Sequence, residues 1–160
     1  MATLFDTVHE FFEDQGWPPA RIEGVTALRL QFRGQHGSWM CVVRVREAQG
    51  QIAFYSLAPS AVPAGRRAAM AEFIARANYG MIVGNFELDV GDGDLRFRTS
   101  LDLGPAGAEG APIFSDLFGR IIAANLHMMD RYLPGIADVV GGRTPAEAIA
   151  AIERPPAPGA

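Results

Sequence analysis

Hydrophobic and polar residues recur with two different periods along the first third of the chain. A spacing of three or four residues predicts an amphipathic helix from about Leu4 to Gln15, with Thr3 as its N-cap. The apolar stripe of this helix consists of Leu4, Val8, Phe11 and Phe12. After Pro19 the period becomes two, which is typical of half-buried strands. Three such segments, at about 28–33, 39–46 and 51–57, have short connections and predict an antiparallel meander.

A helix and a hairpin are predicted next. The helix follows Pro63, ends at Gly80 and carries on one face Met70, Phe73, Ile74 and Ala77. The hairpin spans 85–102, because Asp92-Gly93 is a favoured two-residue turn between alternating segments. With this turn, the register pairs apolar with apolar and acid with base on the two sides of the hairpin. The expected pairs include Leu88 with Phe97, Glu87 with Arg98, and Asp89 with Arg96.

The last third of the chain predicts a long apolar helix and a short one. Apolar residues lie nearly all round a helix from about Ile113 to Tyr132, so we expect it to be covered on two sides. We expect Pro134 to break or kink it. Thr144 and Glu147 form a capping box that begins the last helix.

Strands in runs, rather than single strands alternating with helices, are typical of the α+β class. The predicted order is α-β-β-β-α-β-β-α, with an extra short helix and a five-stranded antiparallel sheet backed by helices. We expect a single domain over residues 1–153 and a disordered, Pro-rich tail over 154–160. We assign no function to the Gly/Ala-rich loop at 104–112.

Composition narrows the classes of function. The 160 residues are 49% hydrophobic and 20% charged, as in globular proteins. A net charge of −4 argues against nucleic acid as a partner. All 14 positive side chains are arginine, so any cationic site consists of planar, bidentate groups. The absence of a signal peptide, of a long apolar run and of any cysteine beyond Cys41 predicts a cytoplasmic protein without a membrane partner.

Candidate catalytic groups all have a structural interpretation. His9, His36 and His127 lack a second ligand at metal-binding spacing, and Cys41 lies mid-strand on an apolar face. The acidic segment around Asp92 lacks the later glutamate of a calcium loop. The chain contains no lysine and therefore no phosphate-binding P-loop. We therefore expect no enzyme, no catalytic residue, no metal and no cofactor.

One face of the predicted meander indicates binding. Arginines surround apolar and aromatic residues there, which resembles a protein interface more than a solvated sheet. The candidate residues are Arg29, Arg33, Met40, Val42, Arg44, Arg46, Tyr55 and Leu57. Two alternatives remain open: helices cover both faces of the sheet, or the arginines pair with Glu47, Glu87 and Asp89.

Four segments resemble the YbjN family, namely Ala71–Asn78, Gly84–Asp89, Asp92–Arg98 and Asp130–Pro134. The resemblance runs over about residues 4–140. It implies a fold similar to that of type III secretion chaperones, and a role as a bacterial sensory transduction regulator that contacts other proteins. It carries over no catalytic or cofactor residue. The matching residues, which we expect to be structural, are Gly84, Asn85, Phe86, Glu87, Asp89, Arg96, Arg98, Tyr132 and Pro134.

The leading hypothesis is therefore a non-enzymatic protein-binding regulator or chaperone-like adaptor, which we expect to be a homodimer. A dedicated secretion chaperone that holds an effector segment is the second hypothesis, and a neighbouring gene for a secreted protein would favour it. A small-ligand-binding module or enzyme is the third. It requires a deep pocket on which polar groups such as Asn125, His127 and Asp130 converge.

Overall fold

The computed structural model describes residues 2–105, 111–154 and 159. Its helices are α1 (Leu4–Asp14), α2 (Arg67–Asn78), α3 (Ala111–Val140) and α4 (Pro145–Ile152). Its strands are β1 (Ala20–Arg21), β2 (Ala27–Arg33), β3 (Ser38–Arg46), β4 (Gln51–Leu57), β5 (Asn85–Leu88) and β6 (Leu95–Asp102). The α+β class and the order of the main elements are as the sequence predicts.

The sheet has six strands, in the order β1-β2-β3-β4-β6-β5, and every neighbouring pair is antiparallel. The prediction of five strands was therefore wrong. The additional strand, β1, has only two residues, and Ala20 and Arg21 pair with Arg29 and Leu28. A segment this short shows no alternation, so the hydrophobic pattern could not reveal it.

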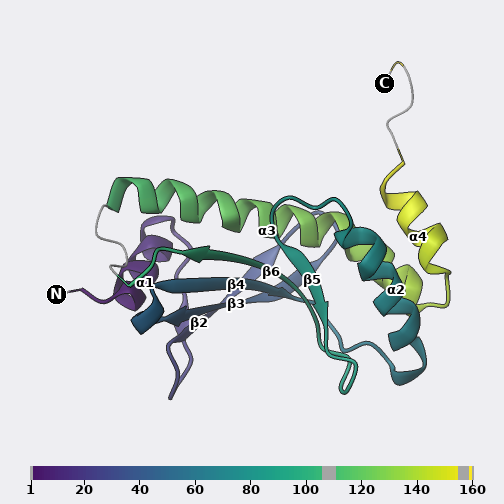
Figure 1. Cartoon of the computed structure of the whole chain (residues 1–160), viewed down its shortest axis with the longest axis horizontal. Coiled ribbons are helices and arrows are strands. Elements are labelled where there is room, and N and C mark those ends of the chain that lie inside the picture. Colours follow the sequence, from purple (N-terminus) through teal and green to yellow (C-terminus); the bar gives the residue numbers. More distant parts are fainter. Residues whose placement is uncertain (1, 106–110, 155–158, 160) are drawn as a thin grey trace.

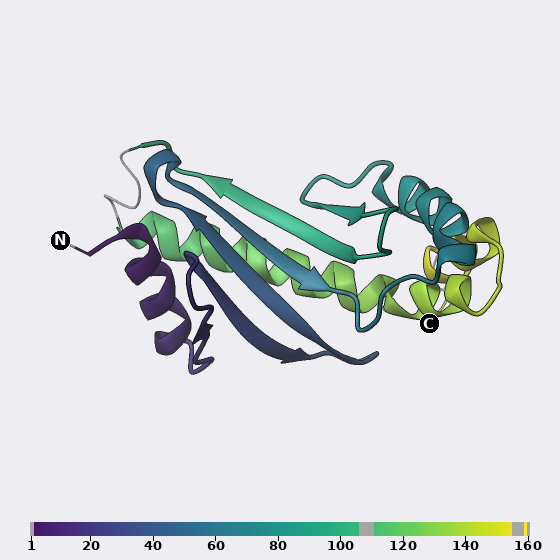
Figure 2. The same ribbon diagram turned by 90° about the horizontal axis from the view of Figure 1, so that it is seen from below.

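One face of the sheet is covered by helices and the other is not. Figure 1 shows α3 running along the covered face, α1 beside it at one end, and α2 and α4 around the far end of α3. Figure 2 is turned by 90° and views the molecule from below, where no helix of the described residues stands in front of the sheet. We call this second side the open face.

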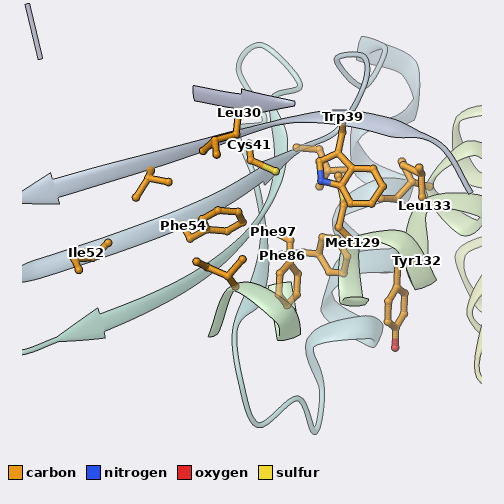
Figure 3. Packing of buried hydrophobic residues seen from close by; sticks show 14 of the residues in the cluster. Leu30, Trp39, Cys41, Ile52, Phe54, Phe86, Phe97, Met129, Tyr132 and Leu133 are labelled. Carbon is orange, nitrogen blue, oxygen red and sulfur yellow. The ribbon is translucent and has the colours of Figure 1, made fainter. Parts of the chain in front are cut away.

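Aromatic rings make up much of the core between α3 and the sheet. Near α1, Phe12 packs against Phe54 and Phe118 with ring centroids 6.4 and 5.7 Å apart. Toward α2, Phe86 packs edge-on against Phe97 and Tyr132, at 4.8 and 5.5 Å (Figure 3). Edge-to-face pairs of this kind add to the free energy gained from burial, so these contacts join α3 to both halves of the sheet.

A buried polar cluster also joins α3 to the sheet. Asn125 is fully buried, accepts a hydrogen bond from the Ser56 hydroxyl (2.6 Å) and donates to the Thr99 hydroxyl (3.2 Å). The same amide donates to the backbone carbonyls of Phe54 and Phe97. Ser56 in turn accepts from the indole of Trp39 at 2.8 Å. Since each member has a partner, the cluster specifies how α3 sits on the sheet.

The observed hairpin register differs from the predicted one by two residues. Glu87 lies opposite Arg96 rather than Arg98, and Leu88 lies opposite Leu95 rather than Phe97. The loop contains residues 89–94 instead of two residues. The carboxylates of Asp89 and Asp92 cap N–H groups inside the loop at 2.8 Å. The guanidinium of Arg67 donates to three loop carbonyls, a long-range contact that local turn preference does not include.

Two helix predictions have different outcomes. Helix α3 continues through Pro134 to Val140, so this residue does not break the helix, which was one of the two effects expected of it. Buried Ile136 and Val139 beyond the proline pack into the core, and this packing outweighs the hydrogen bond that Pro134 cannot donate.

Both predicted N-caps are confirmed, since Thr3 and Thr144 each form a capping box.

Part of the loop at 104–112 and most of the tail at 154–160 lie outside the described residues, and the predictions for them are not tested. Within the described ranges, no helix combines the length and apolarity that a membrane crossing requires.

Candidate functional site

The open face contains all eight residues that the sequence marked as a binding surface. Strand residues alternate in burial, and these eight lie at the more accessible positions of β2, β3 and β4. Four arginines and Met40 are exposed, and the remaining three side chains are half-buried. The members are Arg29, Arg33, Met40, Val42, Arg44, Arg46, Tyr55 and Leu57.

Strand pairing places apolar residues between arginines. One row across the sheet runs Arg29–Val42–Tyr55–Arg98, where each residue is the Cα partner of the next. Beside this row, the guanidinium carbon of Arg96 lies 4.5 Å from the centre of the Tyr55 ring, which is a cation–π contact. The centre of the face is thus apolar and aromatic, and arginines stand on both sides.

Two hollows lie on this face, next to the loop that joins β1 to β2. The larger one measures about 1000 Å³ and the smaller one about 320 Å³. Val25, Arg44 and Tyr55 line both of them. Because Val25 belongs to the loop and is 52% exposed, it forms an apolar wall beside the sheet. The open face is therefore a hollowed surface with one raised edge.

The carboxylates of this region do not neutralise the four predicted arginines. Glu87 pairs with Arg96 and Arg98 through Nε–Oε distances of 2.8 and 2.9 Å. Glu47 instead accepts from the backbone N–H groups of Leu4 and Phe5 at the start of α1. In the described part of the chain, Arg29, Arg33, Arg44 and Arg46 have no carboxylate within 4.0 Å. In the described residues, therefore, no helix covers the open face, and Glu47, Glu87 and Asp89 do not pair with these four arginines.

The β5 edge of the sheet is closed to an added strand at its centre. The Asn78 side chain on α2 accepts from the backbone N–H of Phe86 at 2.7 Å and donates to its carbonyl at 3.1 Å. These are the outward backbone groups that an added strand would use. Sequence reasoning missed this role, because only the fold brings α2 beside β5.

The family-motif residues around β5 make contacts within the fold. Gly84 has φ +79°, and a Cβ atom there would lie 2.7 Å from the carbonyl oxygen of Arg98. The Asn85 amide donates to the carbonyl of Phe86, whose own side chain is buried. On α3, the Tyr132 hydroxyl donates to Glu153 at 2.7 Å. Burial and this acidic partner raise the pKa of Tyr132 to about 12.

Of the three polar groups proposed for an enzyme pocket, two share a hollow and the third does not. His127 and Asp130 line a separate hollow of about 900 Å³ with His36, whereas Asn125 is buried in the cluster beneath α3. Burial raises the pKa of the Cys41 thiol to about 12, which leaves it a poor nucleophile. Among residues 2–105, 111–154 and 159, no three His, Cys, Asp or Glu side chains are grouped to hold a metal ion.

Asp130 holds the turn between β2 and β3 against α3. Its carboxylate accepts from the backbone N–H groups of Gln35 (3.2 Å) and His36 (2.9 Å). Partial burial raises the pKa of Asp130, but the hydrogen bonds from His36 and Gln35 outweigh this effect and the net pKa is lowered. The charged form therefore stabilises the native turn.

These features define a helix-backed antiparallel sheet with one open, arginine-lined face. A family model described as "Putative bacterial sensory transduction regulator" matches residues 5–138, so the chain belongs to the YbjN family. The crystal structure of YbjN from E. coli, a putative transcription regulator by its own description, has 15% identity and a TM-score of 0.59. The match covers 79% of this chain and 85% of that one.

Two protein complexes are also similar in structure. The HopA1–SchA chaperone–effector complex has 14% identity and a TM-score of 0.48, with 79% of this chain and 91% of that chain covered. The ExsC–ExsE complex has 10% identity and a TM-score of 0.48, with 81% and 90% covered. No curated protein matches the sequence.

Proposed function

We propose that this chain is a non-enzymatic, protein-binding regulator or chaperone-like adaptor of the bacterial cytoplasm, whose partner docks on the open face. The observation that supports this proposal most is the apolar centre around Val42 and Tyr55. Near it, Arg29 and Arg44 have no carboxylate within 4.0 Å among the described residues, whereas Arg96 and Arg98 share Glu87. The regulator description of the YbjN family supports a role in protein contacts.

The residue types on the open face suit a protein interface. Tyrosine and arginine are enriched among the residues that dominate binding energy, since both offer large contact areas and defined hydrogen bonds. Tyr55 is half-buried at the centre of the face, and Arg44 lines both hollows. A partner that covers Tyr55 would exclude water from this centre and strengthen its polar contacts with Arg44.

Affinity capture from the native host, read by mass spectrometry, tests the proposal. Tyr55→Ala and Arg44→Ala should each abolish a partner that wild-type protein retains, while circular dichroism and thermal unfolding show an intact fold. Arg120→Ala is the matched control, because Arg120 is exposed on the outer side of α3 and pairs with Asp116 of the same helix. Equal recovery of every partner by wild type and both open-face variants would contradict the proposal.

We further propose a homodimer formed through the loop between α2 and β5. Tyr79 and Ile82 on this loop are 92% and 96% exposed, and neighbouring Val83 is 44% exposed. The outer side of α3 offers less apolar surface, because Leu117 at 40% is its one large apolar side chain above a third exposed within 114–140. Such contiguous exposed apolar residues mark interaction sites.

Light scattering at micromolar concentration tests the dimer. We expect a dimeric mass for wild type, a monomer for a Tyr79→Ser/Ile82→Ser variant, and an unchanged dimer for Leu117→Ser. A monomeric wild type would contradict the dimer, and a dimeric double variant would contradict its placement.

A further inference from the structure

We propose that the open face binds an acidic, extended segment that crosses the strands and inserts an apolar side chain between two carboxylates. This inference rests on the proposed function and specifies the chemistry of the partner. It follows from the charge of the face, from the spacing of its residues and from the state of the sheet edges.

The charge of the open face is opposite to that of the whole chain. Among strand residues, six arginines and two carboxylates project from this side of the sheet, which is an excess of four positive charges. Asp89, Asp94 and Glu47 lie at the margins of the face and reduce this excess to one, on a protein of net charge −4. The arginines are Arg29, Arg33, Arg44, Arg46, Arg96 and Arg98, and the strand carboxylates are Glu87 and Asp102. A guanidinium group recognises a carboxylate through two parallel hydrogen bonds, so the face is complementary to acidic side chains.

The row Arg29–Val42–Tyr55–Arg98 sets the spacing of the partner. Its four residues lie on adjacent strands, so Arg29 and Arg98 are three strand spacings apart, about 14 Å between Cα atoms. An extended chain advances about 3.3 Å per residue, so carboxylates about four residues apart reach both arginines. Arg98 already pairs with Glu87 through its Nε atom at 2.9 Å, and the five N–H donors of a guanidinium group allow a second carboxylate to bind there. The residue between them lies over Val42 and Tyr55, next to the 320 Å³ hollow that Val25 and Leu57 line.

The sheet edges favour binding across the face over strand addition. Asn78 occupies the outward backbone groups of Phe86 on β5, as described above. On the opposite edge, β1 pairs with the first part of β2, and the Trp17 indole donates to the Gln31 carbonyl at 2.9 Å. A segment that arrives at this sheet therefore meets the side chains of the open face more readily than a free strand edge.

The same arginines could contact phosphate groups, but two features favour an acidic peptide over nucleic acid. Single-stranded nucleic acid binds on successive aromatic rings, whereas the row through the centre of this face has one ring, that of Tyr55. The net charge of −4 also repels a long polyanion, while a short segment with two or three carboxylates experiences mainly the local arginines.

Selection from a display library of random 12-residue peptides tests the inference. We expect peptides enriched on the wild-type chain to carry two acidic residues about four positions apart with an apolar residue between them. Counter-selection uses Arg29→Ala/Arg44→Ala, which should lose this enrichment, and Arg120→Ala, which should keep it. Enrichment of basic or uncharged peptides, or no enrichment above the double variant, would overturn the inference.

Fluorescence anisotropy of the most enriched peptide measures how much each substitution weakens its binding. Arg29→Ala should weaken binding about tenfold, the value of one charge-assisted hydrogen bond, and binding should weaken as salt increases. Replacing both acidic residues of the peptide by their amides should have a similar or larger effect. A labelled 12-nucleotide single strand should bind neither wild type nor variant, and tight binding of this probe would overturn the choice of an acidic peptide.

The outcomes separate this inference from the proposed function. If capture loses a partner in Tyr55→Ala but cross-linking shows a neutral or basic segment on the face, the docking function stands and the acidic chemistry is wrong. If capture is the same for every variant, the docking function itself is wrong.

Discussion

Replacing Asn125 by alanine should destabilise the protein strongly, although this residue carries no charge and lies on the covered side of the sheet. Its side chain is fully buried and makes four hydrogen bonds that join α3 to β4 and β6. The change leaves the buried Ser56 hydroxyl without its acceptor, which costs about 1–3 kcal/mol, and it opens a cavity as well. We expect a loss of about 3 kcal/mol in the free energy of unfolding.

Urea and thermal unfolding measure this loss. For a chain of this size, about 3 kcal/mol corresponds to a decrease in Tm of about 6–12 °C. Asn125→Leu fills the cavity without hydrogen bonds and isolates the polar contribution. His127→Ala, two residues along on the exposed side of α3, should change stability by less than about 0.5 kcal/mol. A loss for Asn125→Ala no larger than that for His127→Ala would refute a structural role for this cluster.

Three further changes test contacts that hold loops in place. Arg67→Ala should lower the free energy of unfolding by about 1–2 kcal/mol and speed amide hydrogen exchange at residues 89–94, because the Arg67 guanidinium donates to the carbonyls of this loop. The control Arg76→Ala, on the exposed side of α2, should have neither effect. Gly93→Ala should lower Tm more than Gly24→Ala. Both glycines have positive φ, but only at Gly93 would a Cβ atom lie 2.2 Å from a backbone oxygen, that of Val62. Equal decreases in Tm would show that φ alone determines the cost. Asp130→Asn should destabilise most at neutral pH, where the wild-type carboxylate is charged. The difference from wild type should close as the pH falls below the ordinary carboxyl pKa, because a lowered folded pKa adds stability that disappears when the folded carboxylate is protonated; a pH-independent difference would exclude this role.

Local sequence patterns predicted the open face well. Period-two alternation assigns each strand residue to one side of the sheet, and this assignment needs no knowledge of the partner strand. Arg44 and Tyr55 therefore lie on the predicted face even though their hollow also requires Val25 from a distant loop. The capping boxes at Thr3 and Thr144 were equally local, since each involves residues three positions apart.

The hairpin shows where a local pattern is insufficient. Glu87 was expected opposite Arg98 and lies opposite Arg96, yet it contacts both guanidinium groups. A shift of two residues preserves the face of every side chain, so alternation cannot distinguish the two registers. The six-residue loop is selected by Arg67 from α2, a contact between segments more than twenty residues apart.

The sequence by itself determined the α+β class, the order of the main elements and the composition of the open face, because periodicity and caps depend on residues a few positions apart. Only the tertiary structure decided which charges stay without a partner. It placed Glu47 at the start of α1 and Glu87 between Arg96 and Arg98, and it left Arg44 without a carboxylate in the described residues. Pairing between distant segments depends on how the chain folds back on itself, and that information is not contained in local spacing.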